Sequence, residues 1–360
     1  MHSHIVDERE PIDSEAYARE SCHLDADITT WSDYVRLVER VSARFTGRFA
    51  QRTFDYVHPV RLQHCPVRFR KPYPVKVAYT HWGHPSQPTV ICIGGVVNTA
   101  MRFSYLADAL STRYRVVCMD WLGRGHSGWL ATEGDYSHST YLEQLTQLIK
   151  HLRVKSVALL GSSLGGTVAI DFAATHRQVV DRVVLNDIGP FMSRSRRRRR
   201  AETLARHYVF RSPDELLRRI GASHKNDGPM SNEVKLFLAH HQTKWSDDEN
   251  GRVYRHDIRA VQAYKQHAAR DINQWSAWRR IPCRVLLIHG MTSDALAEET
   301  IRKMQRTTDM SVMHVPHTGH TPALTDSHQI ELLHLWLDDA GPAGEWCSLP
   351  RSNGHREAVG

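Results

Sequence analysis

A glycine-flanked serine near the middle of the chain places the strongest constraint on its fold. The pentapeptide Gly161-Ser162-Ser163-Leu164-Gly165 follows an apolar run at 156–160 and precedes a helix-like run at 166–174. A strand, a G-x-S-x-G turn and a helix in this order predict a nucleophile elbow, a turn so sharp that its central residue is strained. Bulky residues on either side of the serine would collide, and glycine avoids the collision because it has no Cβ. We therefore expect Ser163 to project its hydroxyl above the edge of a sheet.

Strand-like apolar runs alternate with helical patterns on both sides of this turn. Such alternation predicts an α/β fold with a mainly parallel sheet that is covered by helices on both faces. The expected strands are Val75–Thr80, Thr89–Ile93, Arg115–Met119, Ser156–Leu160, Arg182–Asn186, Arg284–His289 and Ser311–Val315. The expected helices are Met101–Leu110, Ser139–Leu152, Gly165–Ala174, Glu298–Gln305 and His328–Leu337.

The alternation is interrupted once, and this divides the chain into regions. Residues 61–190 and 281–340 form the expected core, whereas the polar, mostly helix-like segment 191–280 predicts a helical cap over the carboxyl edge of the sheet, where open α/β sheets bind ligands. Residues 1–60 read as an accessory segment with an amphipathic helix over Trp31–Phe49, which we expect to pack on the core; the alternative is that it covers part of an active-site entrance. Residues 341–360 are rich in Gly, Pro, Ser and charge, and are predicted to be disordered.

Two further residues are candidates to activate the serine. A serine hydroxyl needs a base to take its proton and an acid to hold that base in the right tautomer. We expect His320 to be the base, because it lies on a glycine-containing loop between the last strand and the last helix; His314 and His317 are its competitors. Asp294 follows a strand and a glycine turn and is the favoured acid. Asp187 follows the preceding strand and remains an alternative, because both aspartates would lie at one edge of the sheet.

Backbone amides would complete the site by holding the negative oxygen that develops during acyl transfer. One donor is expected to be the amide of Leu164, directly after the candidate nucleophile. The second is expected on the loop Ile93-Gly94-Gly95-Val96-Val97-Asn98, where the amide of Val96 is our choice. A Gly-Gly pair at the end of an apolar run suits a close approach of the backbone.

These motifs together resemble the α/β-hydrolase superfamily, and in particular bacterial members with a serine nucleophile. The resemblance covers roughly residues 75–338 and departs from the family at Gly94, where histidine is common. It implies cofactor-free chemistry, with no metal, on a small-molecule ester or other acyl substrate. Epoxide hydrolases and haloalkane dehalogenases of the family use an aspartate nucleophile, so Ser163 argues against both. The motifs that carry the resemblance are Ile93-Gly94-Gly95-Val96, Met119-Asp120-Trp121-Leu122-Gly123-Arg124-Gly125-His126-Ser127, Gly161–Gly166, Leu185-Asn186-Asp187-Ile188-Gly189-Pro190, Gly290-Met291-Thr292-Ser293-Asp294 and Gly319-His320.

The bulk composition excludes several other classes. Six arginines, Arg194 and Arg196–Arg200, supply six of the eight net positive charges, without interleaved aromatic residues or a nucleic-acid module. We interpret this run as the solvated start of a surface helix, with a site for phosphate or an anionic surface as the alternative, and expect no nucleic-acid partner. The sequence shows no C-x-x-C or H-E-x-x-H motif and no apolar run of about 18 residues, which predicts neither a zinc site nor a membrane span. The polar N-terminus and the cysteines in apolar runs suggest a cytoplasmic protein; the oligomeric state is not specified.

The favoured function is therefore a serine hydrolase that cleaves a small or medium carboxylic ester through an acyl-enzyme. A carbon–carbon bond hydrolase, a lactonase or an acyltransferase would use the same three residues on another substrate. A non-catalytic ligand-binding protein of the same fold is the alternative from a different class, and the complete Ser, His and Asp set argues against it.

Overall fold

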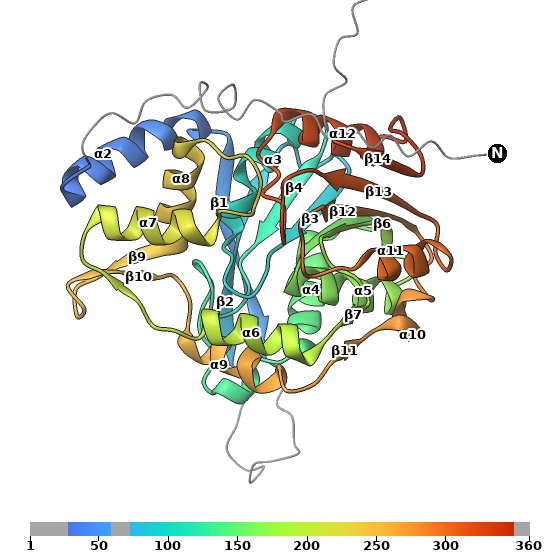
Figure 1. Cartoon of the computed structure of the whole chain (residues 1–360), viewed down its shortest axis with the longest axis horizontal. Helices are drawn as coiled ribbons and strands as arrows, with labels where there is room; N and C mark the ends of the chain where they lie inside the picture. The colour runs from blue at the N-terminus through green and yellow to red at the C-terminus, as the bar shows by residue number, and fades with distance from the viewer. Residues whose placement is uncertain (1–27, 59–72, 349–360) are drawn as a thin grey trace, which may run out of the picture.

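A nine-stranded sheet forms the centre of the molecule in the computed structural model, which describes residues 28–58 and 73–348 (Figure 1). The strand order is β1-β2-β4-β3-β5-β6-β12-β13-β14. β1 and β4 each pair antiparallel with β2, and all other neighbours in this sheet pair in parallel. The strands are β1 (Phe49–Val57), β2 (Pro74–Trp82), β3 (Thr89–Ile93), β4 (Arg115–Met119), β5 (Val157–Ser162), β6 (Val180–Asn186), β12 (Arg284–Gly290), β13 (Met310–Val315) and β14 (Glu345–Cys347).

Helices cover both faces of this sheet, which confirms the predicted fold class. Successive side chains of a strand point to opposite faces. Ile91 and Ile93 of β3 therefore join the core under α4 (His138–Leu152), α5 (Leu164–Thr175), α10 (Trp275–Trp278) and α11 (Glu298–Gln305). Val90 and Cys92 join the opposite core, under α2 (Trp31–Ser42), α3 (Ser104–Leu110), α8 (Asn232–Gln242) and α12 (Ser327–Leu337). Short 3₁₀ helices η1 (Ala43–Phe45), η2 (Ala100–Phe103) and η3 (Glu133–Asp135) complete these layers.

The N-terminal region contributes more to the core than the sequence predicts. The expected helix over Trp31–Phe49 begins at Trp31 with a capping box between Thr30 and Asp33, but α2 ends at Ser42 and η1 at Phe45. Gly47 then takes a positive φ of 72° and the chain enters β1, which pairs with β2 along its whole length. The predicted accessory segment thus supplies an edge strand of the main sheet; its residues 1–27 lie outside the described part of the chain.

The predicted disorder after residue 341 is wrong for residues 345–347. These residues form β14, which adds to β13 in parallel at the far edge of the sheet. The pairing is short, and it replaces the water that would bond to the backbone of a solvated tail with partners on β13. Residues 349–360 lie outside the described part of the chain.

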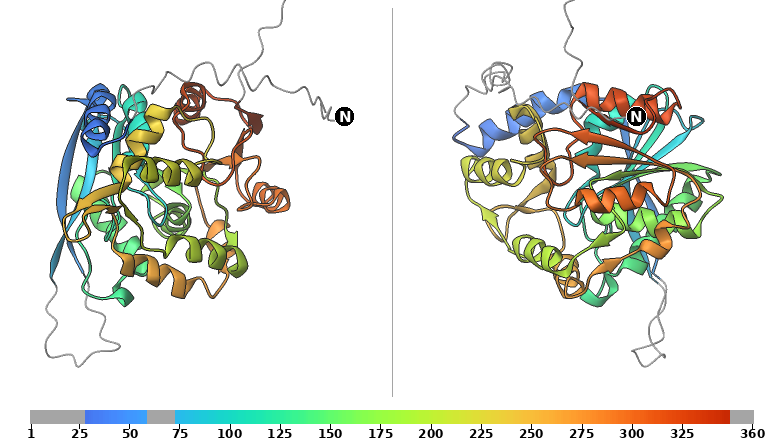
Figure 2. Two further views of the ribbon diagram at one scale, coloured as in Figure 1. Left: turned by 60° about the vertical axis from the view of Figure 1, so that its left-hand side comes forward. Right: turned by 45° about the vertical axis from the view of Figure 1, so that its right-hand side comes forward.

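The segment 191–280, which we predicted to be a cap, is mostly helical and also holds two small sheets. Its helices α6 to α9 gather to one side of the central sheet (Figures 1 and 2). No helix among residues 28–58 and 73–348 is both long and apolar enough to cross a membrane. The elements not yet given are α6 (Arg194–Leu204), α7 (Pro213–Ser223) and α9 (Ile258–His267), the sheet of β8 (Val209–Phe210), β10 (Gly251–Tyr254) and β9 (Thr243–Ser246), and the pair β7 (Phe191–Met192) and β11 (Ile272–Asn273).

Candidate active site

Ser163 lies at the sharp turn between β5 and α5, as the sequence predicts. Its backbone angles are φ 51° and ψ −112°, a sparsely populated region that costs on the order of 1–3 kcal/mol. The two flanking glycines make the turn possible. A Cβ at Gly161 would lie 2.6 Å from the carbonyl oxygen of Gly165, and a Cβ at Gly165 would lie 2.2 Å from that of Ile93. Any side chain at either position would therefore open the turn.

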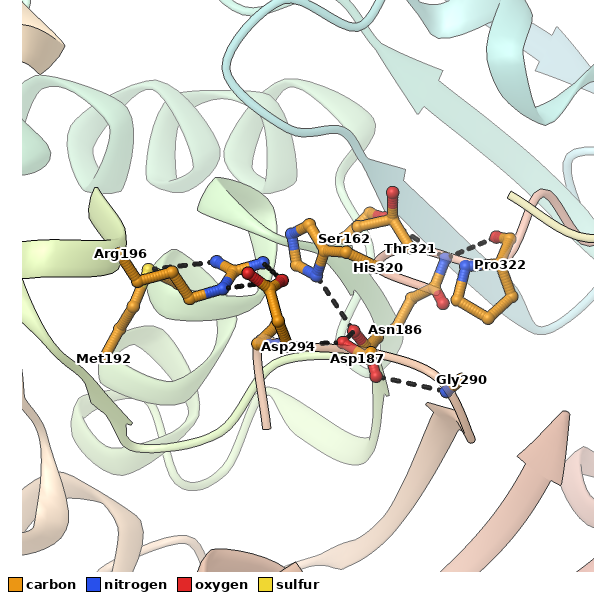
Figure 3. A network of polar contacts seen from close by, with 12 residues as sticks. Ser162, Asn186, Asp187, Met192, Arg196, Gly290, Asp294, His320, Thr321 and Pro322 are labelled. Carbon is orange, nitrogen blue, oxygen red and sulfur yellow. Dashed lines mark hydrogen bonds and ion pairs between the residues drawn. The ribbon is translucent and has the colours of Figure 1, made fainter. Parts of the chain in front are cut away.

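His320 is held by Asp187, the aspartate that directly follows β6 (Figure 3). The Nδ1 of His320 lies 2.9 Å from the Oδ2 of Asp187, whose side chain is completely buried. Asp187 also accepts hydrogen bonds from the Gly290 amide at 3.1 Å and from the Ser293 hydroxyl at 2.5 Å. Since a carboxylate only accepts, the proton of His320 lies on Nδ1 and leaves Nε2 free to accept another. This arrangement fixes both the tautomer and the plane of the imidazole.

Asp294 does not contact His320, and this corrects the favoured choice of acid. Its side chain is 68% exposed, and its Oδ1 accepts from the Nε and Nη2 of Arg196 at 3.2 and 3.1 Å. Arg199 approaches its other oxygen at 3.6 Å. Figure 3 shows the Arg196–Asp294 pair beside the His320–Asp187 pair but separate from it. Asp294 therefore connects α6 to the loop after β12 rather than orienting the histidine.

The loop that carries His320 is tightly supported by its neighbours. His317, Thr321 and Leu324 take positive φ values of 51°, 61° and 56°, unusual for residues other than glycine. Asn186 donates from Nδ2 to the carbonyl oxygen of Pro322 at 2.9 Å and to the Ser162 hydroxyl at 3.1 Å. This single amide joins the histidine loop to the residue before the candidate nucleophile.

The two competing histidines lie elsewhere. His317 is exposed and lines neither cavity described below. His314 bonds to Glu345 through Nε2 at 2.5 Å and to the His289 ring through Nδ1 at 3.1 Å. His320 is therefore the one of the three that shares a cavity with Ser163.

The surroundings of His320 favour its neutral form. Desolvation by the surrounding chain lowers the pKa of His320 below the ordinary 6.5, and this outweighs the opposing effect of Asp187. The positive charges of Arg196 and Arg200 lower the pKa further. A neutral imidazole is the form that can accept a proton from a serine hydroxyl.

The two predicted oxyanion donors are placed near Ser163. Leu164 begins α5, and a Cβ at Gly95, next to Val96, would lie 3.4 Å from the Cβ of Ser163. Within the described residues, the amides of Leu164 and Val96 have no hydrogen-bond acceptor, whereas the Gly95 amide donates to Asn98. Both amides are thus available to a bound oxygen atom.

Gly94, where the family often has histidine, is supported by other contacts. Its carbonyl oxygen accepts from the indole of Trp121 at 2.8 Å and from the Gly165 amide at 3.1 Å. Arg124 donates from Nε to the carbonyl oxygen of Val96 at 2.8 Å. These bonds hold the loop 94–96 in place.

Two cavities meet at Ser163. The larger, of about 410 Å³, is lined by Ser163, His320, the Gly95–Asn98 loop and residues of the segment 191–280. The smaller, of about 280 Å³, is lined by Ser163 and Leu164, by aromatic and aliphatic side chains, and by Arg124 and Arg197. Tyr264 of α9 lines both. A ligand at Ser163 would therefore have cavity space on two sides of the serine.

The arginine run lies on α6, and its interpretation as a solvated helix start is wrong for part of it. Arg196 and Arg197 are only 8% and 6% exposed. Arg197 donates to the carbonyl oxygen of Arg270 and lies over the ring of Tyr264, 5.8 Å from its centroid. Arg200 is exposed to solvent but lines the larger cavity. The spacing of Arg196 and Arg200 could have indicated this placement, because residues four apart lie on the same face of a helix and both of these line the larger cavity.

No group of three or more His, Cys, Asp or Glu side chains in the described ranges is arranged to hold a metal ion.

Comparisons with known proteins identify the family and the fold of this chain. The sequence model of the family described as alpha/beta hydrolase fold matches residues 88–327. The chain is 32% identical over 267 residues to the 3-hydroxybutyrate-oligomer hydrolase of Cupriavidus necator. The aligned region covers 71% of this chain and 91% of that protein. A putative hydrolase from Rickettsia typhi has a similar structure, with a TM-score of 0.72, 23% identity, and coverage of 81% of this chain and 99% of that one. The structure of E-2-(acetamidomethylene)succinate hydrolase gives a TM-score of 0.67 at 20% identity over 81% of this chain and 99% of that one.

Proposed function

Because this chain belongs to the α/β-hydrolase family, we propose that it is a serine hydrolase in which Ser163 is the nucleophile, His320 the general base and Asp187 the acid that orients it. The substrate is a small or medium carboxylic ester. The observation that carries the proposal is the 2.9 Å contact of Asp187 with the Nδ1 of His320, in the same cavity as the strained Ser163.

The proposed reaction has two half-reactions. The Ser163 oxygen bonds to the ester carbonyl carbon while its proton passes to the Nε2 of His320. The amides of Leu164 and Val96 hold the negative oxygen of the tetrahedral intermediate, which is worth about 10²–10³ in rate for each donor. The intermediate collapses, the bond to the alcohol oxygen breaks, and His320 gives its proton to that oxygen. Water then attacks the acyl-enzyme with His320 again acting as base, and releases the acid and Ser163.

The cavity volumes and the relative from Cupriavidus necator support a short aliphatic substrate. Each cavity accommodates one half of a small ester, with volumes of about 280 and 410 Å³. The relative, which hydrolyses 3-hydroxybutyrate oligomers according to its name, is matched over 91% of its length. We propose short oligoesters of a 3-hydroxy acid as the substrate class.

A labelling and turnover experiment tests the reaction type. Purified protein is treated with a fluorophosphonate probe and assayed with p-nitrophenyl esters and with the dimer of 3-hydroxybutyrate. We expect labelling and turnover by the wild type, and loss of both in Ser163→Ala, since Ser163 is the proposed nucleophile. Ser86→Ala is the matched control, because Ser86 is exposed and lines neither cavity. A wild-type protein that neither labels nor cleaves any of these esters would overturn the proposal.

A further inference from the structure

The larger cavity at Ser163 carries an excess of positive charge. Four arginines line it, Arg102, Arg196, Arg200 and Arg219, against a single carboxylate, Asp227. A concave site lined by one sign of charge concentrates ligands of the opposite sign. The excess therefore points to an anionic group on the ligand.

Two of the four arginines are already neutralised by aspartates. Arg102 pairs with Asp227 at 3.1 Å, and Arg196 pairs with Asp294 outside the cavity lining. Asp227 also accepts a hydrogen bond from His224 at 2.6 Å, so the same carboxylate oxygen already has two partners, Arg102 and His224. These two ion pairs leave Arg200 and Arg219 as the source of the excess charge.

Arg200 and Arg219 have no acidic partner among the described residues. Arg219, on α7, donates to the Tyr208 hydroxyl, and its guanidinium lies 4.1 Å from the centroid of that ring. This contact positions the group without neutralising it. Arg200, on α6, makes no ion pair or hydrogen bond within residues 28–58 and 73–348, and desolvation by surrounding groups lowers the pKa of its guanidinium. The Asp227 carboxylate lies near enough to raise the pKa of Arg200, but it makes no ion pair with Arg200 and is already bound to Arg102 and His224. Arg200 therefore carries a positive charge, since arginine stays protonated in proteins, without an ion-pair partner of its own among the described residues.

His320 determines which half of an ester would meet these arginines. The proton from His320 goes to the alcohol oxygen when the tetrahedral intermediate collapses, so the alcohol half must lie on the side of His320. His320 lines the larger cavity and not the smaller one. The alcohol half therefore occupies the cavity that contains Arg200 and Arg219, and both Arg196 and Arg200 lie near enough to His320 to affect its pKa.

The smaller cavity suits the acyl half. Tyr136, Tyr141, Met192 and Ile272 contribute to its lining. Arg124 also reaches this cavity, but it is held by the carbonyl oxygens of Val96 and Leu122 and by the Tyr141 hydroxyl. Arg197 lines it too, and is held by the carbonyl oxygen of Arg270 and the ring of Tyr264. Asp171, the carboxylate of this lining, bonds to His138 at 2.7 Å. The smaller cavity therefore has two arginines and one carboxylate, a smaller positive excess than the four arginines and one carboxylate of the larger cavity.

We propose that Arg200 and Arg219 bind a carboxylate carried by the alcohol half of the substrate, so that the enzyme selects esters of hydroxy acids whose carboxylate is free. This inference rests on the proposed function and adds the direction in which the substrate lies. In the 3-hydroxybutyrate dimer the alcohol half carries the free carboxylate, while the acyl half ends in a hydroxyl and a methyl group. Longer oligomers would then be cleaved one unit at a time from the carboxylate end.

A pair of isosteric substrates tests the proposal. The wild type is assayed with the 3-hydroxybutyrate dimer and with the same dimer as its terminal primary amide, which is neutral. We expect kcat/KM for the acid to exceed that for the amide by at least about tenfold, because a charge-assisted hydrogen bond is worth about ten- to a hundredfold. In Arg200→Gln and Arg219→Gln this acid-to-amide ratio should fall by about tenfold each, mostly through KM, and Arg200→Lys should restore part of it.

Arg198→Gln is the matched control, since Arg198 lies on the same helix, is exposed and lines neither cavity. Its acid-to-amide ratio should equal that of the wild type. If the wild type labels with the fluorophosphonate and cleaves the amide as well as the acid, the carboxylate site is overturned while the proposed function stands. If Arg198→Gln lowers the ratio as much as Arg200→Gln, a diffuse positive field replaces the proposed site. If the wild type neither labels nor cleaves either dimer, the proposed function fails first and the inference fails with it.

Discussion

The loops after β6 and β12 start from neighbouring parallel strands, and each carries an aspartate, yet the two carboxylates lie in opposite environments. Asp187 is the residue directly after β6; it is fully buried and accepts hydrogen bonds from three groups, including His320. Asp294 comes four residues after β12 and is 68% exposed, with two arginines of α6 as its partners.

The difference shows that position along the sheet edge does not decide which aspartate meets the histidine. Asp187 has a positive φ of 54°, and its amide bonds to the carbonyl oxygen of Ile288, so its carboxylate stays below His320. The loop after β12 instead turns at Gly290–Ser293, through a 2.9 Å backbone bond, and carries Asp294 outward to the segment 191–280. The nearer residue of that loop, Ser293, supports Asp187.

We expect the largest loss of activity when the Asp187 carboxylate is replaced by an amide. Asp187→Asn should lower kcat by about 10³–10⁴, because an amide can donate to Nδ1 and so stabilise the wrong tautomer of His320. Turnover of a p-nitrophenyl ester, with circular dichroism to confirm folding, measures the loss. If Asp294→Asn proved the more damaging of the two, the assignment of the acid would be reversed.

The pH profile tests the surroundings of His320. Because burial lowers the pKa of this group, the neutral base persists below the ordinary pKa of 6.5, and activity should be lost only as the pH falls further. On this acid limb kcat/KM should fall about tenfold per pH unit, since one proton inactivates the base. A limb with its midpoint above pH 6.5, measured on the free enzyme with a neutral ester, would contradict the expected environment.

Ser293→Ala should produce a smaller loss of activity, and it tests whether the loop after β12 supports Asp187 through Ser293. It removes a hydroxyl donor from the buried Asp187 carboxylate, and a hydrogen bond to a charged group is worth about 1.5–3 kcal/mol. We expect a lower Tm and a fall in kcat on the order of tenfold. Ser293→Thr, which keeps the hydroxyl, is the matched control and should recover most of the activity; no difference between the two variants would remove Ser293 from the support of Asp187.

Asp294→Asn should have the smallest effect. The carboxylate is largely exposed, and exposed ion pairs contribute about 0.2–1 kcal/mol, which corresponds to less than about fivefold in KM. The change should diminish at high salt, where the pair is screened, whereas the Asp187→Asn defect should not. Steady-state kinetics of both variants at low and high ionic strength make the comparison.

Local sequence signals were enough to predict the elbow at Ser163, the limits of two central strands and the position of His320. The elbow at Ser163 could be predicted because Gly161 and Gly165, the glycines that relieve the crowding of the turn, lie two residues on either side of the serine and are visible in the sequence. The crowding at Gly161 comes from Gly165 itself, within the same short motif, whereas that at Gly165 comes from Ile93 and required the tertiary structure. The strands at Thr89–Ile93 and Arg115–Met119 have the predicted limits, since strands buried on both faces are continuous apolar runs. His320 could be placed from its loop between the last predicted strand and helix.

Only the tertiary structure decided which aspartate bonds to His320 and which arginines of the run 194–200 are buried or ion-paired. Both depend on the direction of a side chain relative to residues more than 90 positions away, as in the contacts of Asp187 with His320 and of Arg196 with Asp294. Periodicity and composition carry no information on such distant pairs. The same holds for β1 and β14, because each pairs with a strand, β2 or β13, that local sequence patterns do not identify as its neighbour.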